Sequence, residues 1–117
     1  MPGRRTLVLL TLLASTATVA GIAPTALGRS TARVTVTATD FKFKFVPARL
    51  PAGRHTFTLT NSGQAKHDLK IAGRKTRILS MGQKATLTVT MKKGRYPYLC
   101  TVPGHAQLGM KGTLVIR

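Results

Sequence analysis

Short stretches in which apolar and polar residues alternate make up most of the chain after residue 30, and Gly, Pro and Asn separate them. Alternation with a period of two is typical of half-buried β-strands, because successive side chains point to opposite faces of a sheet. No helical repeat of useful length occurs in this region. About seven short strands, with turns roughly every ten residues, predict an all-β fold, a Greek-key antiparallel β-sandwich.

Each expected strand has one apolar face. The strands with their inward residues are RVTVTA (Val34, Val36, Ala38), FKFKF (Phe41, Phe43, Phe45), HTFTLT (Phe57, Leu59), HDLKIA (His67, Leu69, Ile71) and ATLTVTM (Ala85, Leu87, Val89, Met91), followed by YPYLC and GTLVIR. The inward positions change from even to odd numbers between the first two strands. We therefore expect a β-bulge near Thr39 and Asp40, because one extra residue restores both apolar sets to the core.

The first 27 residues have the pattern of an export signal. Arg4 and Arg5 form a basic start, and an uncharged stretch from Leu7 to Ala26 ends in small residues that suit a signal peptidase. The paired arginines also resemble a twin-arginine signal. An uncleaved membrane anchor is the alternative, since the stretch approaches the length of a spanning helix. We expect residues 1–27 to be a signal peptide or anchor and residues 28–117 to be one domain.

The chain is strongly basic. It has 19 Lys and Arg against two acidic residues, Asp40 and Asp68, for a formal net charge of +17. Such a charge favours acidic partner proteins or an anionic membrane surface. The lysines and aromatic rings of DFKFKF could also stack on nucleic acid. An export signal argues against nucleic acid, and lysines on alternate positions are typical of the solvated face of a strand.

Cys100 is the only cysteine, so it cannot form an internal disulfide. An exposed thiol in an oxidising compartment would be oxidised, and Cys100 therefore needs burial or ligation. As a catalytic nucleophile it would have His105 nearby but no evident third partner. As a buried structural thiol it would leave its neighbours unexplained. As a metal ligand it accounts for His105 and for Met110, which follows at the same spacing.

A thiolate with imidazoles suits copper or zinc, and a thioether favours copper. A second histidine is then needed. His67 shares the inward face of its expected strand, which is consistent with a ligand or with a core histidine. The neighbours of His55 give no metal context, and we expect His55 at the surface. Met81 and Met91 are expected in packing or surface positions.

The segments NSGQAKHDLKI and YPYLCTVPGHAQLGMKGTLVI resemble the cupredoxin family of type 1 (blue) copper proteins, which are plastocyanin-like. The likeness covers residues 33–117, and the spacing C-x4-H-x4-M is similar to that of rusticyanin-like and sulfocyanin-like members. The resemblance implies one mononuclear copper ion with His67, Cys100 and His105 as ligands and Met110 in a weak axial position. It also implies electron transfer without enzyme activity.

Two details of the resemblance concern the surroundings of the site. The residue after the first histidine is often Asn in the family, whereas this chain has Asp68, which could accept a hydrogen bond from Thr101. Tyr98 and Tyr96 resemble the tyrosine that pins the corner of Greek-key sandwiches. One ring edge of His105 is expected at the surface within a small apolar docking patch made by Val102, Pro103, Ala106 and Leu108.

The sequence therefore predicts an exported, monomeric copper protein, periplasmic or extracellular, that carries single electrons between redox proteins. A copper delivery or storage protein is the first alternative. A basic β-sandwich that binds surfaces or polymers is the second.

Overall fold

A computed structural model describes residues 3, 14–16, 21 and 31–117. The expected signal segment, residues 1–27, lies outside the described residues apart from those isolated positions. Among the residues that are described, no helix is long and apolar enough to cross a membrane. Every regular element within residues 31–117 is a β-strand, and the prediction of an all-β sandwich is confirmed.

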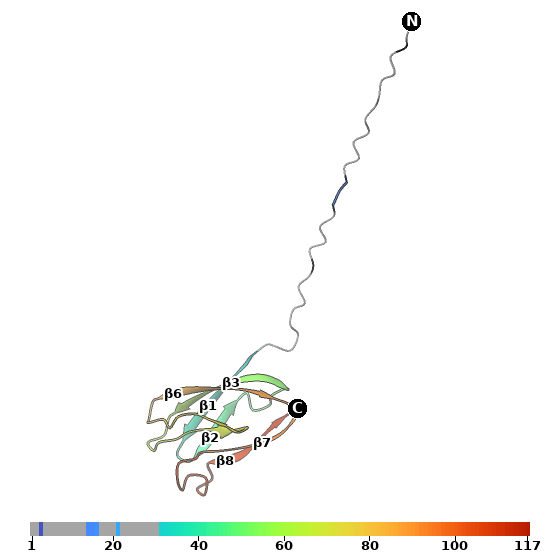
Figure 1. The fold of residues 1–117 in the computed structure, drawn as a ribbon. Coiled ribbons are helices and arrows are strands. Elements are labelled where there is room, and N and C mark those ends of the chain that lie inside the picture. Colours follow the sequence, from blue (N-terminus) through green and yellow to red (C-terminus); the bar gives the residue numbers. More distant parts are fainter. Residues whose placement is uncertain (1–2, 4–13, 17–20, 22–30) are drawn as a thin grey trace.

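Eight strands form two four-stranded sheets that face each other (Figure 1). The first sheet has the order β2 (Lys42–Val46), β1 (Ala32–Thr39), β3 (Gly53–Asn61), β6 (Lys84–Met91). The second has the order β5 (Arg74–Lys75), β4 (Lys70–Ile71), β7 (Gly94–Leu99), β8 (Lys111–Ile116). Strands β1 and β3 are parallel, which departs from the purely antiparallel expectation, while the other strand pairs are antiparallel.

The core fills the space between the two sheets, as the alternating pattern predicts. Its buried members come from both inner faces and include Val34, Val36, Ala38, Phe57, Leu59, Leu69, Ile71, Val89, Met91, Leu114 and Ile116. Phe41, Phe43 and Phe45 are half-buried and pack against this core. Burying this apolar surface provides the main driving force for folding, at roughly 25 cal/mol for each Å² removed from water.

The predicted bulge near Thr39 and Asp40 is wrong. Strands β1 and β2 form an antiparallel hairpin in which Thr39 pairs with Lys42, so Asp40 and Phe41 form a two-residue turn. Directly paired residues lie on the same face, and Ala38 pairs with Phe43. The turn therefore changes the inward positions from even to odd numbers, which is the shift that the bulge was meant to explain.

The predicted strand HDLKIA is shorter than expected. Only Lys70 and Ile71 form a strand. His67 forms an isolated antiparallel bridge with Leu79, in which each residue donates its backbone N–H to the carbonyl of the other. His67, Leu69 and Ile71 are all buried, as their spacing predicts. The irregular backbone around His67 belongs to a segment that crosses between the sheets.

The expected surface position of His55 is wrong. Its side chain is buried, and its Nε2 lies 2.7 Å from the carbonyl oxygen of Pro51. His55 shares the inward face of β3 with Phe57 and Leu59, and that spacing was the signal for burial.

Of the two tyrosines, Tyr96 donates its hydroxyl to the carbonyl of Lys92, in the manner of a corner tyrosine.

Candidate metal centre

The four residues expected as ligands lie where strands of the second sheet end and begin. Cys100 follows β7 directly, Met110 precedes β8 directly, and His105 lies in the loop between them. The backbone N–H of Cys100 donates to the carbonyl of Met110 at 3.0 Å, which closes the loop at its base. His67 reaches the same place from the segment that links β3 to β4.

Three donor atoms face one another. The Nδ1 atoms of His67 and His105 are 3.2 Å apart, and Cys100 Sγ lies 3.9 Å from the first and 3.6 Å from the second. Metal–nitrogen and metal–sulfur bonds of about 2.0–2.3 Å place the donors of a shared ion roughly 3–4 Å apart. The three side chains therefore fit one ion without rearrangement.

Burial differs sharply within this group. His67, Cys100 and Met110 are each at most 1% exposed, whereas His105 is half-buried. Three of the four side chains are therefore shielded from water, and His105 is the member of the group that reaches the surface. Met110 is also held by its backbone, since its N–H donates to the carbonyl of His105 at 3.1 Å.

The loop between Cys100 and Met110 is a compact series of turns. The N–H of His105 donates to the carbonyl of Val102, and the N–H of Leu108 lies within reach of the carbonyls of Gly104 and His105. Gly104 has a φ of 85° and Gly109 a φ of 104°, values at which a side chain would be strained. These turns fix the position of His105 relative to Cys100.

Asn61 organises the approach to His67 from the other side. Its buried amide group donates to the carbonyls of Ala65 and Leu79, both at 2.8 Å, and its Oδ1 accepts the N–H of Gly63. A buried amide with all these partners satisfied holds the chain rigidly, because breaking any bond leaves an unpaired polar group. The backbone leading to His67 is therefore fixed before any metal binds.

Comparison with known proteins places this arrangement in a family. The sequence profile described as "Copper binding proteins, plastocyanin/azurin family" matches residues 18–117. The chain belongs to this family. The predicted membership of the cupredoxins is thus confirmed, and with it copper as the cofactor of a centre arranged like a type 1 copper site. Cupredoxins of this family are blue copper proteins that transfer electrons.

Individual relatives support the fold. Auracyanin-B of Chloroflexus aurantiacus is 45% identical over 42 residues, a match that spans 35% of this chain but only 18% of the length of that curated relative. The structure of auracyanin B has a TM-score of 0.62 at 21% identity and covers 76% of this chain and 90% of its own. Rusticyanin from Thiobacillus ferrooxidans has a TM-score of 0.63 at 19% identity, covering 74% and 77%.

In this cupredoxin the position after His67 is held by a buried carboxylate. Asp68 accepts the backbone N–H of Thr101 at 2.6 Å with one oxygen and the Thr101 hydroxyl with the other. The sequence suggested this pairing, and the structure contains it. It joins the residue after His67 to the residue after Cys100.

Sequence reasoning missed a second carboxylate at the cupredoxin centre. His67 Nε2 donates to Asp40 Oδ1 at 2.7 Å, and this hydrogen bond is the main reason why the pKa of Asp40 lies below that of an ordinary aspartate. Phe41, the next residue, packs edge-on against the rings of His67 and His105. Recognising the hairpin would have shown that Asp40 and Phe41 form its turn, but not that this turn lies against His67.

The cupredoxin's free thiol is protected by its position. Burial raises the pKa of Cys100 above that of an ordinary cysteine, so the metal-free protein holds a protonated thiol at neutral pH. A metal ion that binds this sulfur must displace the proton.

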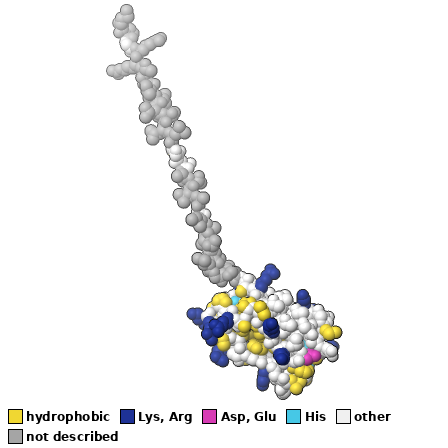
Figure 2. Space-filling model, turned by 180° about the vertical axis from the view of Figure 1, so that it is seen from behind, with side chains coloured by type: hydrophobic (Ala, Val, Ile, Leu, Met, Phe, Trp, Pro, Cys, Tyr) yellow, Lys and Arg dark blue, Asp and Glu magenta, His cyan; other side chains and the backbone are white. Residues whose placement is uncertain are grey.

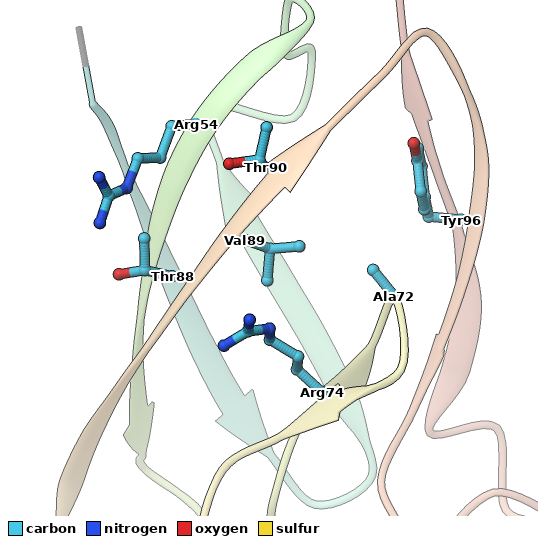
Figure 3. A pocket seen from close by; sticks show the side chains of 7 residues that line it. All are labelled: Arg54, Ala72, Arg74, Thr88, Val89, Thr90 and Tyr96. Atoms are coloured by element: carbon cyan, nitrogen blue, oxygen red, sulfur yellow. The ribbon is translucent and has the colours of Figure 1, made fainter. Parts of the chain in front are cut away.

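A cavity of about 560 Å³ lies elsewhere on the cupredoxin domain (Figure 3). It opens between the edges of the two sheets and is lined by Arg54, Ala72, Arg74, Thr88, Val89, Thr90 and Tyr96. Its lining has no His, Cys or carboxylate, so it offers hydrogen-bond donors and hydroxyls but no metal ligands.

Proposed function

We propose that this chain carries single electrons between redox proteins, with one copper ion held by His67, Cys100, His105 and Met110. The observation that carries the proposal is the convergence of the Nδ1 atoms of His67 and His105 on Cys100 Sγ, all within 4.8 Å of one another. A thiolate with two imidazoles and a weak thioether is the ligand set of electron-transfer copper sites. Met110, which is buried at the base of the same loop, would hold the ion as a weak fourth ligand.

Copper, when bound, supplies a reversible one-electron couple between Cu(I) and Cu(II). The chain contributes rigidity. His67 is held by Asn61 through the backbone, and Cys100 is anchored to Met110 by a backbone hydrogen bond. A site whose donors cannot move serves both oxidation states with little rearrangement, which favours fast electron transfer.

His105 is the proposed route for the electron to and from partners. It is the one member of the group with substantial exposure, and its loop presents Pro103 and Leu108 to solvent, the latter 61% exposed. Val102 and Ala106 are half-buried beside them. An apolar surface around a ligand edge allows a partner to approach closely, because its removal from water is favourable.

The geometry favours electron transfer over copper delivery. A protein that hands copper over needs an accessible ion, whereas Cys100, His67 and Met110 are almost completely buried. Membership of a family of electron carriers supports a carrier and not an enzyme.

The remaining parts of the proposal rest on the sequence. Residues 1–27 act as a signal peptide or anchor, the domain of residues 28–117 is exported to the periplasm or the cell exterior, and the domain acts as a monomer. Basic side chains are spread over the face shown in Figure 2, with little acidic surface among them. Acidic redox proteins, or an anionic membrane surface, are the partners that this charge favours.

Visible absorption of the copper-loaded protein tests the proposal. The oxidised protein should absorb intensely through sulfur-to-copper charge transfer, and Cys100→Ser should lose that absorption while its far-ultraviolet circular dichroism stays that of a β-sandwich. A colourless copper-loaded wild type would refute the assignment. Rapid loss of copper to a competing chelator would instead favour the delivery protein.

A further inference from the structure

The turn between β1 and β2 contacts the centre through the exposed residue Asp40, whose side chain is 31% accessible. His67 is fully buried, and its ring nitrogen Nε2, on the side away from Cys100, lies 2.7 Å from Asp40 Oδ1. A carboxylate that is ionised can only accept hydrogen bonds, so Nε2 carries the proton. The neutral ring then has its lone pair on Nδ1, the atom that faces Cys100 and His105.

Asp40 is itself held in place. Its two carboxylate oxygens accept the backbone N–H groups of Gln64, at 3.0 Å, and Ala65, at 3.2 Å. The carboxylate therefore binds the segment leading to His67 at the same time as the ring of His67. This three-point attachment leaves the carboxylate little freedom to turn away from the ring.

Gly63 leaves the space that this attachment needs. A Cβ atom built on Gly63 would collide with Asp40 Oδ1 and would lie 2.9 Å from His67 Nε2. Gly63 is buried, and its N–H is bonded to Asn61 Oδ1, so the backbone cannot move aside freely. The glycine is required here by the close approach of the carboxylate and the imidazole.

Phe41 restricts the two rings from the same turn. Its ring centroid lies 6.1 Å from that of His67 and 4.9 Å from that of His105, with edge-on geometry in both cases. A flip of the His67 ring would break the bond to Asp40 and disturb this packing. The turn of Asp40 and Phe41 thus limits both the protonation and the orientation of the ring.

We propose that Asp40 is a positioning residue which holds His67 in the tautomer and ring orientation that direct Nδ1 to the metal. A carboxylate that accepts the second N–H of a ligating histidine fixes its tautomer and raises its basicity. The inference rests on the proposed function, because it concerns the same centre. Asp40 is placed to act through His67 and does not face the donor atoms.

The first test uses the metal-free protein with Cys100 reduced. Long-range proton–nitrogen NMR correlations at neutral pH should show the proton of His67 on Nε2 in the wild type. Asp40→Ala should convert a measurable fraction of the rings to the Nδ1 tautomer, and Asp40→Asn, which keeps a carbonyl acceptor, should show a smaller change. Lys42→Gln is the matched control, since it alters a charge on the same hairpin and should leave the tautomer unchanged.

The second test measures affinity for Zn²⁺, which needs no redox chemistry, by competition with a chromophoric chelator. Asp40→Ala should bind Zn²⁺ about 10–100-fold more weakly than the wild type, the usual cost of losing such a partner. Gly63→Ala should weaken binding in the same direction by displacing the carboxylate. Lys42→Gln should bind as the wild type does.

An unchanged tautomer and unchanged Zn²⁺ affinity in Asp40→Ala would overturn the proposal, as would an Nδ1 proton on His67 in the wild type. If Asp40→Ala does not fold, the same readings on Asp40→Ser, which also removes the carboxylate, decide. Failure of the proposed function is distinguishable, because it would appear as a copper-loaded wild type without charge-transfer absorption, whatever the tautomer of His67.

Discussion

Asp68 and Thr101 join the two segments that supply the buried donors, since one follows His67 and the other follows Cys100. Asp68 accepts both the backbone N–H and the hydroxyl of Thr101, and its side chain is completely buried. Removing a partner from a buried carboxylate is costly, because the oxygen left behind has lost water without regaining a hydrogen bond.

Thr101→Val should therefore destabilise the metal-free protein by about 1–3 kcal/mol, the usual cost of an unsatisfied buried group. The isosteric change removes the hydroxyl and leaves the backbone bond in place. Urea unfolding followed by circular dichroism measures the effect. Thr101→Ser keeps the hydroxyl donor and should lose much less stability. Equal losses of stability in both variants would contradict this explanation.

Met110→Leu should keep the intense visible absorption and raise the reduction potential, because a weak axial thioether tunes the site more than it holds the ion. His67→Ala should instead damage the site, lowering copper affinity and changing the absorption. Voltammetry and visible spectroscopy of both variants separate the two roles. Complete loss of copper from Met110→Leu would show that the axial assignment is wrong.

Acid should destabilise the metal-free protein through Asp40. Its hydrogen bond to His67 lowers its pKa in the folded state below the value of about 3.9 expected in the unfolded chain. The unfolded state then binds protons first as pH falls, so the stabilisation is present above about pH 4 and is lost as pH drops through the folded pKa. Urea midpoints between pH 6 and pH 3 should fall less in Asp40→Asn than in the wild type.

Salt should slow electron transfer to an acidic redox protein. The screening length falls from about 30 Å at 0.01 M salt to about 10 Å at 0.1 M, which removes long-range attraction by a basic protein. The rate with a neutral small reductant should hardly change over this range. Equal salt dependence for both reaction partners would exclude a steering role for the charge.

Charge reversal at two pairs of lysines should locate the surface that attracts an acidic partner. Lys66 and Lys111 are exposed and adjoin His67 and Met110 in the chain. Lys92 and Lys93 are exposed in the turn between β6 and β7, at the start of the strand that ends beside Cys100. Reversing the first pair to Glu should flatten the salt dependence more than reversing the second pair.

Much of the fold could be predicted because alternation records directly which side chains face the core. The spacing of Val34 and Val36, and of Phe57 and Leu59, correctly predicted which faces of β1 and β3 are buried. The change of inward positions from even to odd residue numbers does not reveal how two strands are connected. A bulge and a two-residue turn produce the same change. The role of Asp40 depends on that distinction, because only the turn brings its carboxylate to His67.

The candidate ligands could be named from their types and order, and they remain a prediction until a metal is observed on them. Their chemistry is local to short motifs, which is why the sequence suffices. The burial of His55 was predictable from the face of β3 that it shares with Phe57 and Leu59, although its neighbours give no metal context and we expected it at the surface. Its Nε2 instead pairs with the carbonyl oxygen of Pro51 inside the fold.

The direction of β1 gives the domain two unlike ends. Ala32 pairs with His55 near the start of β3, and the strand then runs about 25 Å, at roughly 3.3 Å for each residue, to the turn that meets the copper-binding centre. Whatever precedes Ala32 therefore joins the domain at the end remote from His105. A tether at that end would leave the surface around His105 free for redox partners. Attachment and partner docking would then not compete for the same surface.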